Sequence, residues 1–211
     1  SKKIFSKITK KIIPASSLET AEMIKLIDNS SRDVFFAYAN EIARICDNIG
    51  INALEVINSG KLNYDRTDIA KPGLVGGPCL HKDPYILSES INKKGIKAEI
   101  TLSARNINER QPSEISKFIK KFTRKEKFKK KLKILFLGMA FKGFPVTDDL
   151  RGSMGIEVFK EIKKIFKGSV FFSYDPVVPN KELKKLGLKV EKNLNKSFQN
   201  KDIVIILNDH K

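Results

Sequence analysis

The sequence has few residues that could form covalent or metal cross-links. Its 211 residues include two cysteines, Cys46 and Cys79, and two histidines. Two cysteines give no disulfide framework, which favours a reducing compartment, so we expect a cytoplasmic protein. The cysteines and histidines also lack metal-ligand spacing, and we expect no metal site.

Long apolar segments are missing as well. No apolar run approaches the roughly 18 residues that would cross a bilayer. The first residues carry lysines but no long apolar stretch followed by small residues, so they do not resemble a secretory signal. We therefore expect no association with a membrane.

Acidic residues are too few to balance the basic ones. The chain has 41 lysines and arginines against 24 aspartates and glutamates, a formal net charge of +17. A cationic surface attracts nucleic acids, so a nucleic-acid-binding module is one hypothesis. The lysines are spread along the chain, however, and the basic runs lack interleaved aromatic residues. We favour a lysine-rich solvated surface and expect no nucleic-acid partner; the densest run, residues 117–133, is typical of a boundary.

A long helix dominates the first part of the chain. Ser16 and Glu19 have the spacing of a capping box, and apolar residues then recur with helical period and without Gly or Pro. The pattern predicts one helix over residues 18–48, about 45 Å long, closed by Gly50 as a left-handed cap. A helix of this length is typical of a scaffold on which two subunits pack, so we expect a homodimer through it.

The remaining pattern changes from helical to alternating strand and helix. Further helices are predicted over residues 53–59, 84–94 and 98–122. After the lysine run, continuous apolar runs at 133–137 and 203–207 indicate buried parallel strands, with a helix at 154–166 and strands at 170–174 and 188–190 between them. The sequence therefore predicts an α/β protein: a mainly helical dimerisation domain over 1–124, then a Rossmann-like domain over 125–211 that we expect to be incomplete at its carboxyl end.

The loop from Lys71 to Tyr85 is the most informative segment. Gly76 and Gly77 let the backbone approach a ligand, and Cys79 follows them at the entrance to a helix with Asp83 as its predicted N-cap. A thiol near a helix N-terminus and a lysine is favoured as thiolate, which suits a nucleophile. The alternative is that Cys79 is a small buried residue in a tight loop.

Two polar residues of the long helix also stand out. Lys25 and Asn29 are four residues apart, hence on one face of the helix, and Lys25 interrupts an otherwise apolar run. Both side chains could point at an oxygen that becomes an oxyanion. Alternatively, the lysine extends to solvent.

Together these segments carry a resemblance. The residues TAEMIKLIDN, starting at Thr20, and GGPCLHKD, starting at Gly76, resemble the central domain of the UDP-glucose/GDP-mannose dehydrogenase family. In the second half LGMAFK from Leu137, TDDLRGS from Thr147 and YDP from Tyr174 resemble that family's nucleotide-binding domain. The resemblance spans nearly the whole chain.

The resemblance implies roles for individual residues. Cys79 would be the nucleophile, Asp83 would help to activate water or a proton carrier, and Lys25 with Asn29 would stabilise oxyanions. A larger set would bind ligands: Phe141, Lys142, Gly76 and Gly77 the sugar nucleotide, Arg66 the same ligand from the partner subunit, and Lys82 and Arg151 the pyrophosphate of NAD.

The family's reaction is a four-electron oxidation of carbon 6 of a nucleotide sugar. A first hydride transfer to NAD gives an aldehyde, the cysteine adds to it as a thiohemiacetal, and a second hydride transfer gives a thioester that water releases as the uronic acid. The proline after the glycine pair and the Asp83-Pro84-Tyr85 segment resemble members that act on UDP-N-acetylhexosamines. The products would serve the synthesis of envelope polysaccharides.

The sequence also departs from the family. No G-x-G-x-x-G fingerprint follows a strand, and the family's NAD-binding domain would precede Ser1. We therefore expect no dehydrogenase turnover from these 211 residues alone. The loop before Cys79 is one residue shorter than the family's P-G-x-G-x-G-G, which weakens the assignment of Arg66. Besides the nucleic-acid module, a non-catalytic dimer that binds nucleotide sugars with an inert Cys79 remains an alternative.

Overall fold

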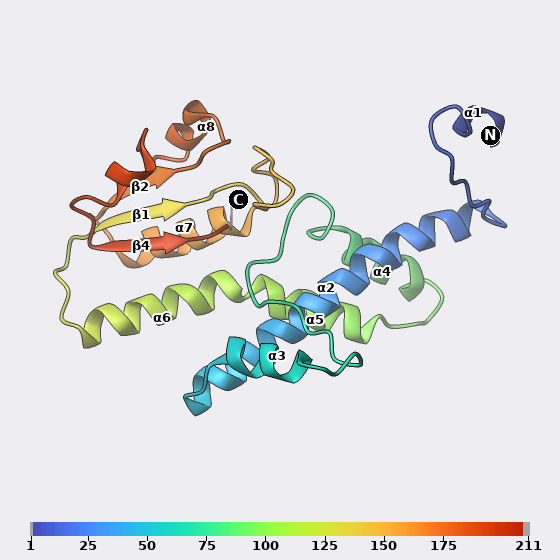
Figure 1. Ribbon diagram of the computed structural model, residues 1–211, viewed down its shortest axis with the longest axis horizontal. Helices are drawn as coiled ribbons and strands as arrows, with labels where there is room; N and C mark the ends of the chain where they lie inside the picture. Colours follow the sequence, from blue (N-terminus) through green and yellow to red (C-terminus); the bar gives the residue numbers. More distant parts are fainter. Residues whose placement is uncertain (1, 209–211) are drawn as a thin grey trace.

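The computed structural model describes residues 2–208 and has the expected α/β fold, with helices first and a parallel sheet after them (Figure 1). No helix in this part of the chain is both long and apolar enough to span a bilayer. The helices are α1 (Lys2–Phe5), α2 (Leu18–Ile49), α3 (Ala53–Lys61), α4 (Asp83–Asn92), α5 (Glu99–Glu109), α6 (Gln111–Lys125), α7 (Met154–Ile165), α8 (Asn180–Lys185) and α9 (Leu194–Ser197). The strands are β1 (Lys133–Leu137), β2 (Val170–Tyr174), β3 (Lys189–Val190) and β4 (Ile203–Ile206).

The long helix α2 is confirmed, but its predicted cap was wrong by one residue. Ser17, not Ser16, is the N-cap, because its side chain accepts a hydrogen bond from the backbone N–H of Thr20. Gly50 closes the helix in the left-handed conformation with φ 76°. Both ends are therefore fixed by local chemistry that the sequence carries.

Two other helix boundaries differ from the prediction. Asp83 is the first residue of α4 rather than its N-cap, a position that Lys82 occupies. The single helix expected over 98–122 is two helices, α5 and α6, that meet at Arg110. Pro112 lacks a backbone N–H and cannot continue the ladder of α5, so it starts a new helix in the first turn of α6.

The sheet has the strand order β3-β2-β1-β4, and every pair is parallel. This order is that of a Rossmann unit, whose ligands bind outside the carboxyl ends of the strands. The prediction of a buried last strand was wrong for β4. It lies at the edge of the sheet, and the side chains of Val204 and Ile206 are 37% and 72% exposed.

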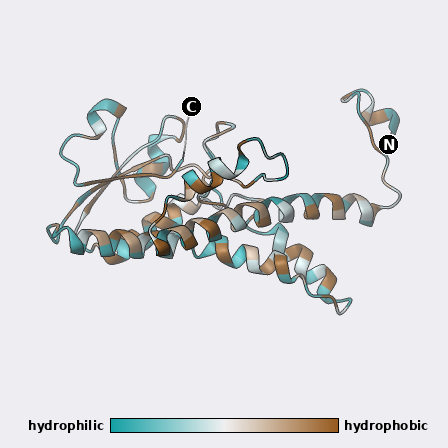
Figure 2. Ribbon diagram, turned by 60° about the horizontal axis from the view of Figure 1, so that its bottom comes forward, coloured by the Kyte–Doolittle hydropathy of each residue, from teal (hydrophilic) through white to brown (hydrophobic). Residues whose placement is uncertain are grey.

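The core of the sheet domain includes a helix from the other half of the chain. Phe136, Phe159 and Phe171 form an aromatic cluster with edge-to-face ring pairs 5.4 and 5.6 Å apart. Ile115 and Ile119 of α6 pack against this core, and Figure 1 shows α6 running alongside α7 below the sheet. In Figure 2 the strands are coloured as hydrophobic, whereas α6 alternates between hydrophobic and hydrophilic residues. A domain boundary at residue 124 remains a proposal.

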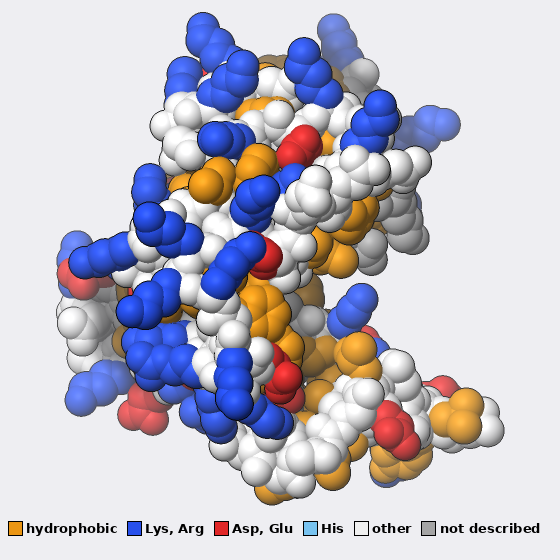
Figure 3. Space-filling model, turned by 90° about the vertical axis from the view of Figure 1, so that its left-hand side faces the viewer, with side chains coloured by type: hydrophobic (Ala, Val, Ile, Leu, Met, Phe, Trp, Pro, Cys, Tyr) orange, Lys and Arg blue, Asp and Glu red, His pale blue; other side chains and the backbone are white. Residues whose placement is uncertain are grey.

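The helical half packs around α2, which contacts α3, α4 and α5. Cys46 is buried on α2, as expected. Lysine and arginine side chains are spread over the face in Figure 3 with few acidic ones between them. The short helices α8 and α9 were not predicted, because their few residues are too short to establish a helical period.

Candidate active site

The loop that carries Cys79 reaches across to the sheet domain. Figure 1 shows the segment between α3 and α4 passing over the helical half toward the loops beyond β1. The backbone N–H of Gly77 donates to the carbonyl of Gly152 at 2.8 Å, and the N–H of Asp83 donates to the carbonyl of Cys79 at 2.9 Å. Cys79 is an exposed free thiol, so the alternative of a buried structural cysteine is wrong.

The glycine pair is required by the close approach of the two halves. A Cβ on Gly76 would lie 2.5 Å from the carbonyl oxygen of Gly152 and 2.7 Å from the Cγ of Met154. Gly77 has φ +96°, and a Cβ there would lie 2.5 Å from the ring of Phe141. Two predicted substrate contacts, Gly77 and Phe141, are therefore packed together, and the cysteine loop is pressed against the sheet domain.

Asp83 gathers the polar residues predicted on α2 and beside the thiol. Its carboxylate accepts hydrogen bonds from Asn29 Nδ2 at 2.5 Å and from Lys82 Nζ at 2.6 Å. Burial alone would raise the pKa of Asp83, but the hydrogen bonds from Lys82 and Asn29, and the nearby charges of Lys82 and Lys25, outweigh it and lower the pKa. Asp83 is therefore an ionised carboxylate held by three groups.

Two cations lie within electrostatic range of the thiol. The pKa of Lys82 is raised, first by its hydrogen bond to Asp83 and then by the negative charge of that carboxylate. The pKa of Arg151 is likewise raised, first by its hydrogen bond to Asp149 and least by Cys79. Both predicted cofactor-binding residues are thus already paired with a carboxylate, Lys82 with Asp83 and Arg151 with Asp149.

The loop after β1 carries Phe141 and Lys142. The ammonium of Lys142 lies 5.2 Å from the centroid of the Phe141 ring, a cation–π contact. The loop backbone is held by Asp175, whose Oδ2 accepts from the N–H of Met139 at 2.7 Å. Ser153 Oγ donates to the carbonyl of Met139 at 2.8 Å. The sequence motif included Asp175 and Ser153 but gave them no such role.

The acidic residue after β2 is not free to bind the ribose of a dinucleotide. Asp175 follows β2, where a dinucleotide-binding unit places the acid that binds the ribose. Here its Oδ1 accepts the N–H groups of Val177 and Val178, both at 2.9 Å, while Oδ2 binds the β1 loop. The carboxylate is fully used by the backbone, so NAD does not fit there.

Arg66 has no role in the contacts described above. It lies exposed in the segment after α3, and no contact places it beside Cys79 or Lys142. The described residues also contain no group of three Asp, Glu, His or Cys side chains that could hold a metal ion. Arg66 as a contact from the partner subunit remains a prediction.

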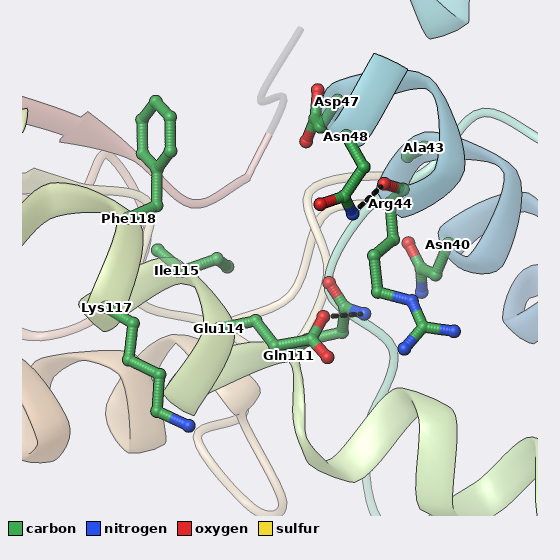
Figure 4. Close-up of a pocket in the computed structure, with 10 residues that line it drawn as sticks. All are labelled: Asn40, Ala43, Arg44, Asp47, Asn48, Gln111, Glu114, Ile115, Lys117 and Phe118. Atoms are coloured by element: carbon green, nitrogen blue, oxygen red, sulfur yellow. Dashed lines mark hydrogen bonds between the residues drawn. The ribbon is translucent and has the colours of Figure 1, made fainter. Parts of the chain in front are cut away.

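A separate cleft of about 530 Å³ lies between α2 and α6 (Figure 4). Its wall from α2 carries Arg44 and Asp47, and its wall from α6 carries Glu114 and Phe118. None of the described residues that line this cleft belongs to the predicted site. The charges of both signs on its walls show no preference for an anionic or a cationic ligand.

No sequence pattern indicates the buried polar residues that contact the cysteine loop. Arg105 of α5 and Asp33 of α2 are 1% and 0% exposed and form an ion pair at 2.9 Å. Asn40 and Asn108 join the same network. Their neighbours in the sequence are ordinary helix residues, so only the spatial arrangement identifies them.

Comparison with known proteins matches both halves of the chain. Residues 19–110 match the UDP-glucose/GDP-mannose dehydrogenase family, central domain, and residues 135–211 match the UDP binding domain of that family. The chain is 33% identical over 198 residues to a UDP-N-acetyl-D-mannosamine dehydrogenase of Yersinia pestis, covering 91% of this chain and 46% of that protein. It is also 33% identical over 196 residues to an NDP-N-acetyl-D-galactosaminuronic acid dehydrogenase of Ralstonia solanacearum, covering 90% of this chain and 43% of that one.

A solved structure agrees with these matches. The UDP-D-ManNAc dehydrogenase of Pyrococcus horikoshii superposes with a TM-score of 0.82 at 32% identity, over 99% of this chain and 46% of that one. The chain thus spans less than half the length of these relatives. With the two family models matching its two halves in order, the chain belongs to the UDP-glucose/GDP-mannose dehydrogenase family.

Proposed function

We propose that this chain supplies the thiol and the sugar-nucleotide contacts of an NAD-dependent dehydrogenase that oxidises carbon 6 of a UDP-sugar to the acid. The observation that carries the proposal is an exposed Cys79 whose carbonyl accepts the N–H of Asp83 and whose loop packs through Gly77 against Phe141. The cysteine loop would supply the nucleophile, and the loop of Phe141 belongs to the matched UDP binding domain.

The proposed substrate is a UDP-N-acetylhexosamine whose acid enters envelope polysaccharides. Relatives that cover 90% or more of the chain are described as dehydrogenases of N-acetylmannosamine or N-acetylgalactosaminuronic acid nucleotides. Lys142 would face the anionic nucleotide, because its ammonium lies over the Phe141 ring at the carboxyl end of β1.

The proposed chemistry of the thiol starts at the aldehyde. The sulfur of Cys79 adds to carbon 6, the carbonyl π electrons move to the oxygen, and that oxygen takes up a proton to give a neutral thiohemiacetal. The ammonium of Lys25 and an amide N–H of Asn29 would stabilise the developing negative charge. After the second oxidation, water adds to the thioester and the thiol leaves as the acid forms.

The lowered pKa of Asp83 refines its proposed role. A general base works best with a pKa near the working pH, whereas Asp83 is held ionised well below it. We therefore assign Asp83 to orienting Asn29, Lys82 and the attacking water, not to storing a proton through the reaction.

The two oxidations require a hydride acceptor, which is NAD by the chemistry of the family. The carboxylate of Asp175 is already used by the backbone, so no hydride step is assigned to the described residues. Both cysteines are free thiols, which suits a reducing compartment such as the cytoplasm.

A homodimer through α2 belongs to the same proposal. The helix leaves a row of apolar side chains exposed, an arrangement typical of an interface: Ile24, Ile27, Tyr38, Ile45 and Ile49 are each between 48% and 65% exposed. A partner packed on this row could supply Arg66 to the nucleotide of the other subunit.

Site-resolved alkylation tests the proposal on this chain. With iodoacetamide near neutral pH, Cys79 should react at least tenfold faster than Cys46. The reaction of Cys79 alone should slow when UDP-N-acetylmannosamine is added at a concentration that calorimetry shows to saturate binding. Cys46 is the internal control, because it lies buried on α2. Saturated binding without any protection of Cys79 would favour a non-catalytic nucleotide-sugar-binding protein instead.

A further inference from the structure

Arg105 is a buried cation that the proposed chemistry does not use. It lies on α5 with 1% of its surface exposed, and its Nη1 is 2.9 Å from Asp33 Oδ1 on α2. A buried ion pair costs much desolvation and does not by itself stabilise a fold. The remaining donors of the guanidinium therefore indicate what the pair does.

Nε lies 3.4 Å from Glu109 Oε1, and the other donors bind the cysteine loop at two points. Arg105 Nη1 donates to the carbonyl of Leu80 at 2.9 Å, and Nη2 donates to the carbonyl of Val75 at 3.0 Å. Between these two carbonyls lie Gly76, Gly77, Pro78 and Cys79. A single rigid, planar group thus fixes both ends of the segment that presents the thiol.

The side chains of the segment contribute little to holding its shape, although the N–H of His81 donates to the carbonyl of Gly77 at 3.1 Å and the N–H of Asp83 donates to that of Cys79 at 2.9 Å. Gly76 and Gly77 have no side chains to pack, and Cys79 is exposed. The N–H of Gly77 donates to Gly152 of the sheet domain, a contact that the loop can make only while its own ends are in place. The glycines that permit the close approach therefore also make the loop dependent on an external support.

The orientation of Arg105 is itself determined by neighbours. Asn108 Nδ2 donates to Asp33 Oδ1 at 2.8 Å, so one carboxylate oxygen receives both side chains. Asn40 Nδ2 donates to Asn108 Oδ1 at 2.9 Å and to the carbonyl of Gly73 at 3.0 Å. Asn40 Oδ1 in turn accepts from the N–H of Gly73 at 2.8 Å. The support extends from α2 and α5 to the start of the loop.

We propose that Arg105 is a positioning residue for Cys79: its guanidinium holds the carbonyls of Val75 and Leu80 at a fixed separation and so places the thiol opposite the bound sugar. The inference rests on the proposed function for the role of the thiol. The support of the loop itself stands on the contacts of the described residues alone.

Hydrogen exchange tests the support without any ligand. Arg105→Lys retains the positive charge beside Asp33 but cannot reproduce the two-pronged contact with the loop. We expect amide exchange in residues 76–83 to rise at least tenfold, while exchange in α2 and α5 changes less than threefold. Arg110→Lys is the matched control, because Arg110 ends the same helix and pairs with Glu114 instead of the loop.

A second variant covers the case in which a lysine is poorly tolerated. The double substitution Arg105→Met with Asp33→Leu removes both buried charges together, which cores often tolerate. It should retain cooperative unfolding and show the same local rise in exchange. Exchange that rises equally in the loop, α2 and α5 in both variants would mean that Arg105 only stabilises the helical core, and would overturn the proposal.

Ligand measurements separate this inference from the proposed function. We expect Arg105→Lys to bind UDP-N-acetylmannosamine within threefold of the wild-type affinity but to form at least tenfold less thiohemiacetal with the corresponding 6-aldehyde. A wild-type chain that forms no adduct would contradict the proposed function, and the exchange experiment would still decide whether Arg105 supports the loop. A variant that forms the adduct as well as wild type would overturn the positioning role.

Discussion

The two loops that meet at Gly77 and Gly152 are held in different ways. The cysteine loop, residues 73–80, is held by hydrogen bonds from its backbone to Arg105 and Asn40, which belong to helices distant in the sequence. The loop after β1, residues 138–142, is held by Asp175 and Ser153, which follow the neighbouring strand and precede α7. One loop depends on a buried ion pair, and the other depends on groups that the parallel sheet brings to its own edge.

This difference predicts where each loop is vulnerable. Removing one member of a buried pair leaves a charge without compensation, whereas changing one acceptor at the sheet edge leaves only backbone N–H groups unpaired. The cysteine loop should therefore be the more easily disrupted of the two, even though the proposed nucleophile lies on it.

The largest effect should come from Asp33. Asp33→Ala leaves Arg105 buried without its partner, and we expect the free energy of unfolding to fall by about 3 to 5 kcal/mol in urea titrations. Asp68→Ala, which removes an exposed partner of Lys61, is the control and should cost less than about 1 kcal/mol. Equal losses of unfolding free energy in the two variants would show that the buried ion pair beside the cysteine loop matters no more than an exposed one.

Asp175 should come second. In Asp175→Asn an NH₂ group replaces one carboxylate oxygen and faces a backbone N–H, so two donors oppose each other. We expect the free energy of unfolding to fall by about 2 kcal/mol in the same titration. Hydrogen exchange should rise in residues 138–142 and stay unchanged in 73–80. Asp148→Asn, at an exposed position nearby, should behave as wild type. A rise in both loops would mean that they are held as one unit.

The contact between the loops gives a third effect. In Gly76→Ala the new Cβ would clash with the carbonyl oxygen of Gly152. We expect the free energy of unfolding to fall by about 1 to 3 kcal/mol and the amide hydrogen of Gly77 to exchange faster. Gly73→Ala is the matched control in the same loop, since nothing lies within 4 Å of its Cβ. It should change stability by less than about 0.5 kcal/mol.

The smallest effect concerns pH. Burial raises the pKa of Asp33, and the charge of Arg105 and the hydrogen bond from Asn108 only partly offset this effect. Asp202 is the opposite case: burial would raise its pKa, but hydrogen bonds from the Lys133 backbone and the Lys129 side chain lower it. Its contribution is present above its ordinary pKa and is lost as pH falls through the folded value.

Thermal melting between pH 5 and pH 2 measures the second case. Asp202→Asn cannot lose a charge on acidification, so its melting temperature should fall by about 1 to 3 °C less than that of wild type over this range. A drop identical to that of wild type would show that other carboxylates account for the acid sensitivity.

The sequence predicted what depends on local or periodic chemistry. The long helix α2, the order of helices and strands, and the motifs around Cys79 and Phe141 follow from patterns within a few residues. The break at Arg110 was missed because the apolar period continues across it, and the exposed edge of β4 was missed because an apolar run does not distinguish an edge strand from a central one.

The support of the site could not be predicted in the same way. Arg105 and Asp33 are 72 residues apart, and each sits among ordinary helical neighbours. Asp175 was part of a recognised motif, but its bonds to Met139 depend on the parallel pairing of β1 with β2. The residue types of the site can thus be predicted from the sequence, whereas their arrangement depends on tertiary packing.

The bond between Cys79 and carbon 6 of the sugar can be tested directly by carbon NMR of the chain. The ligand is a UDP-N-acetylhexosamine 6-aldehyde labelled with ¹³C at carbon 6. We expect a new signal from a carbon bonded to both sulfur and oxygen, absent in Cys79→Ala and present in Cys46→Ala. An aldehyde that binds but gives the same signals with wild type and Cys79→Ala would contradict this expectation.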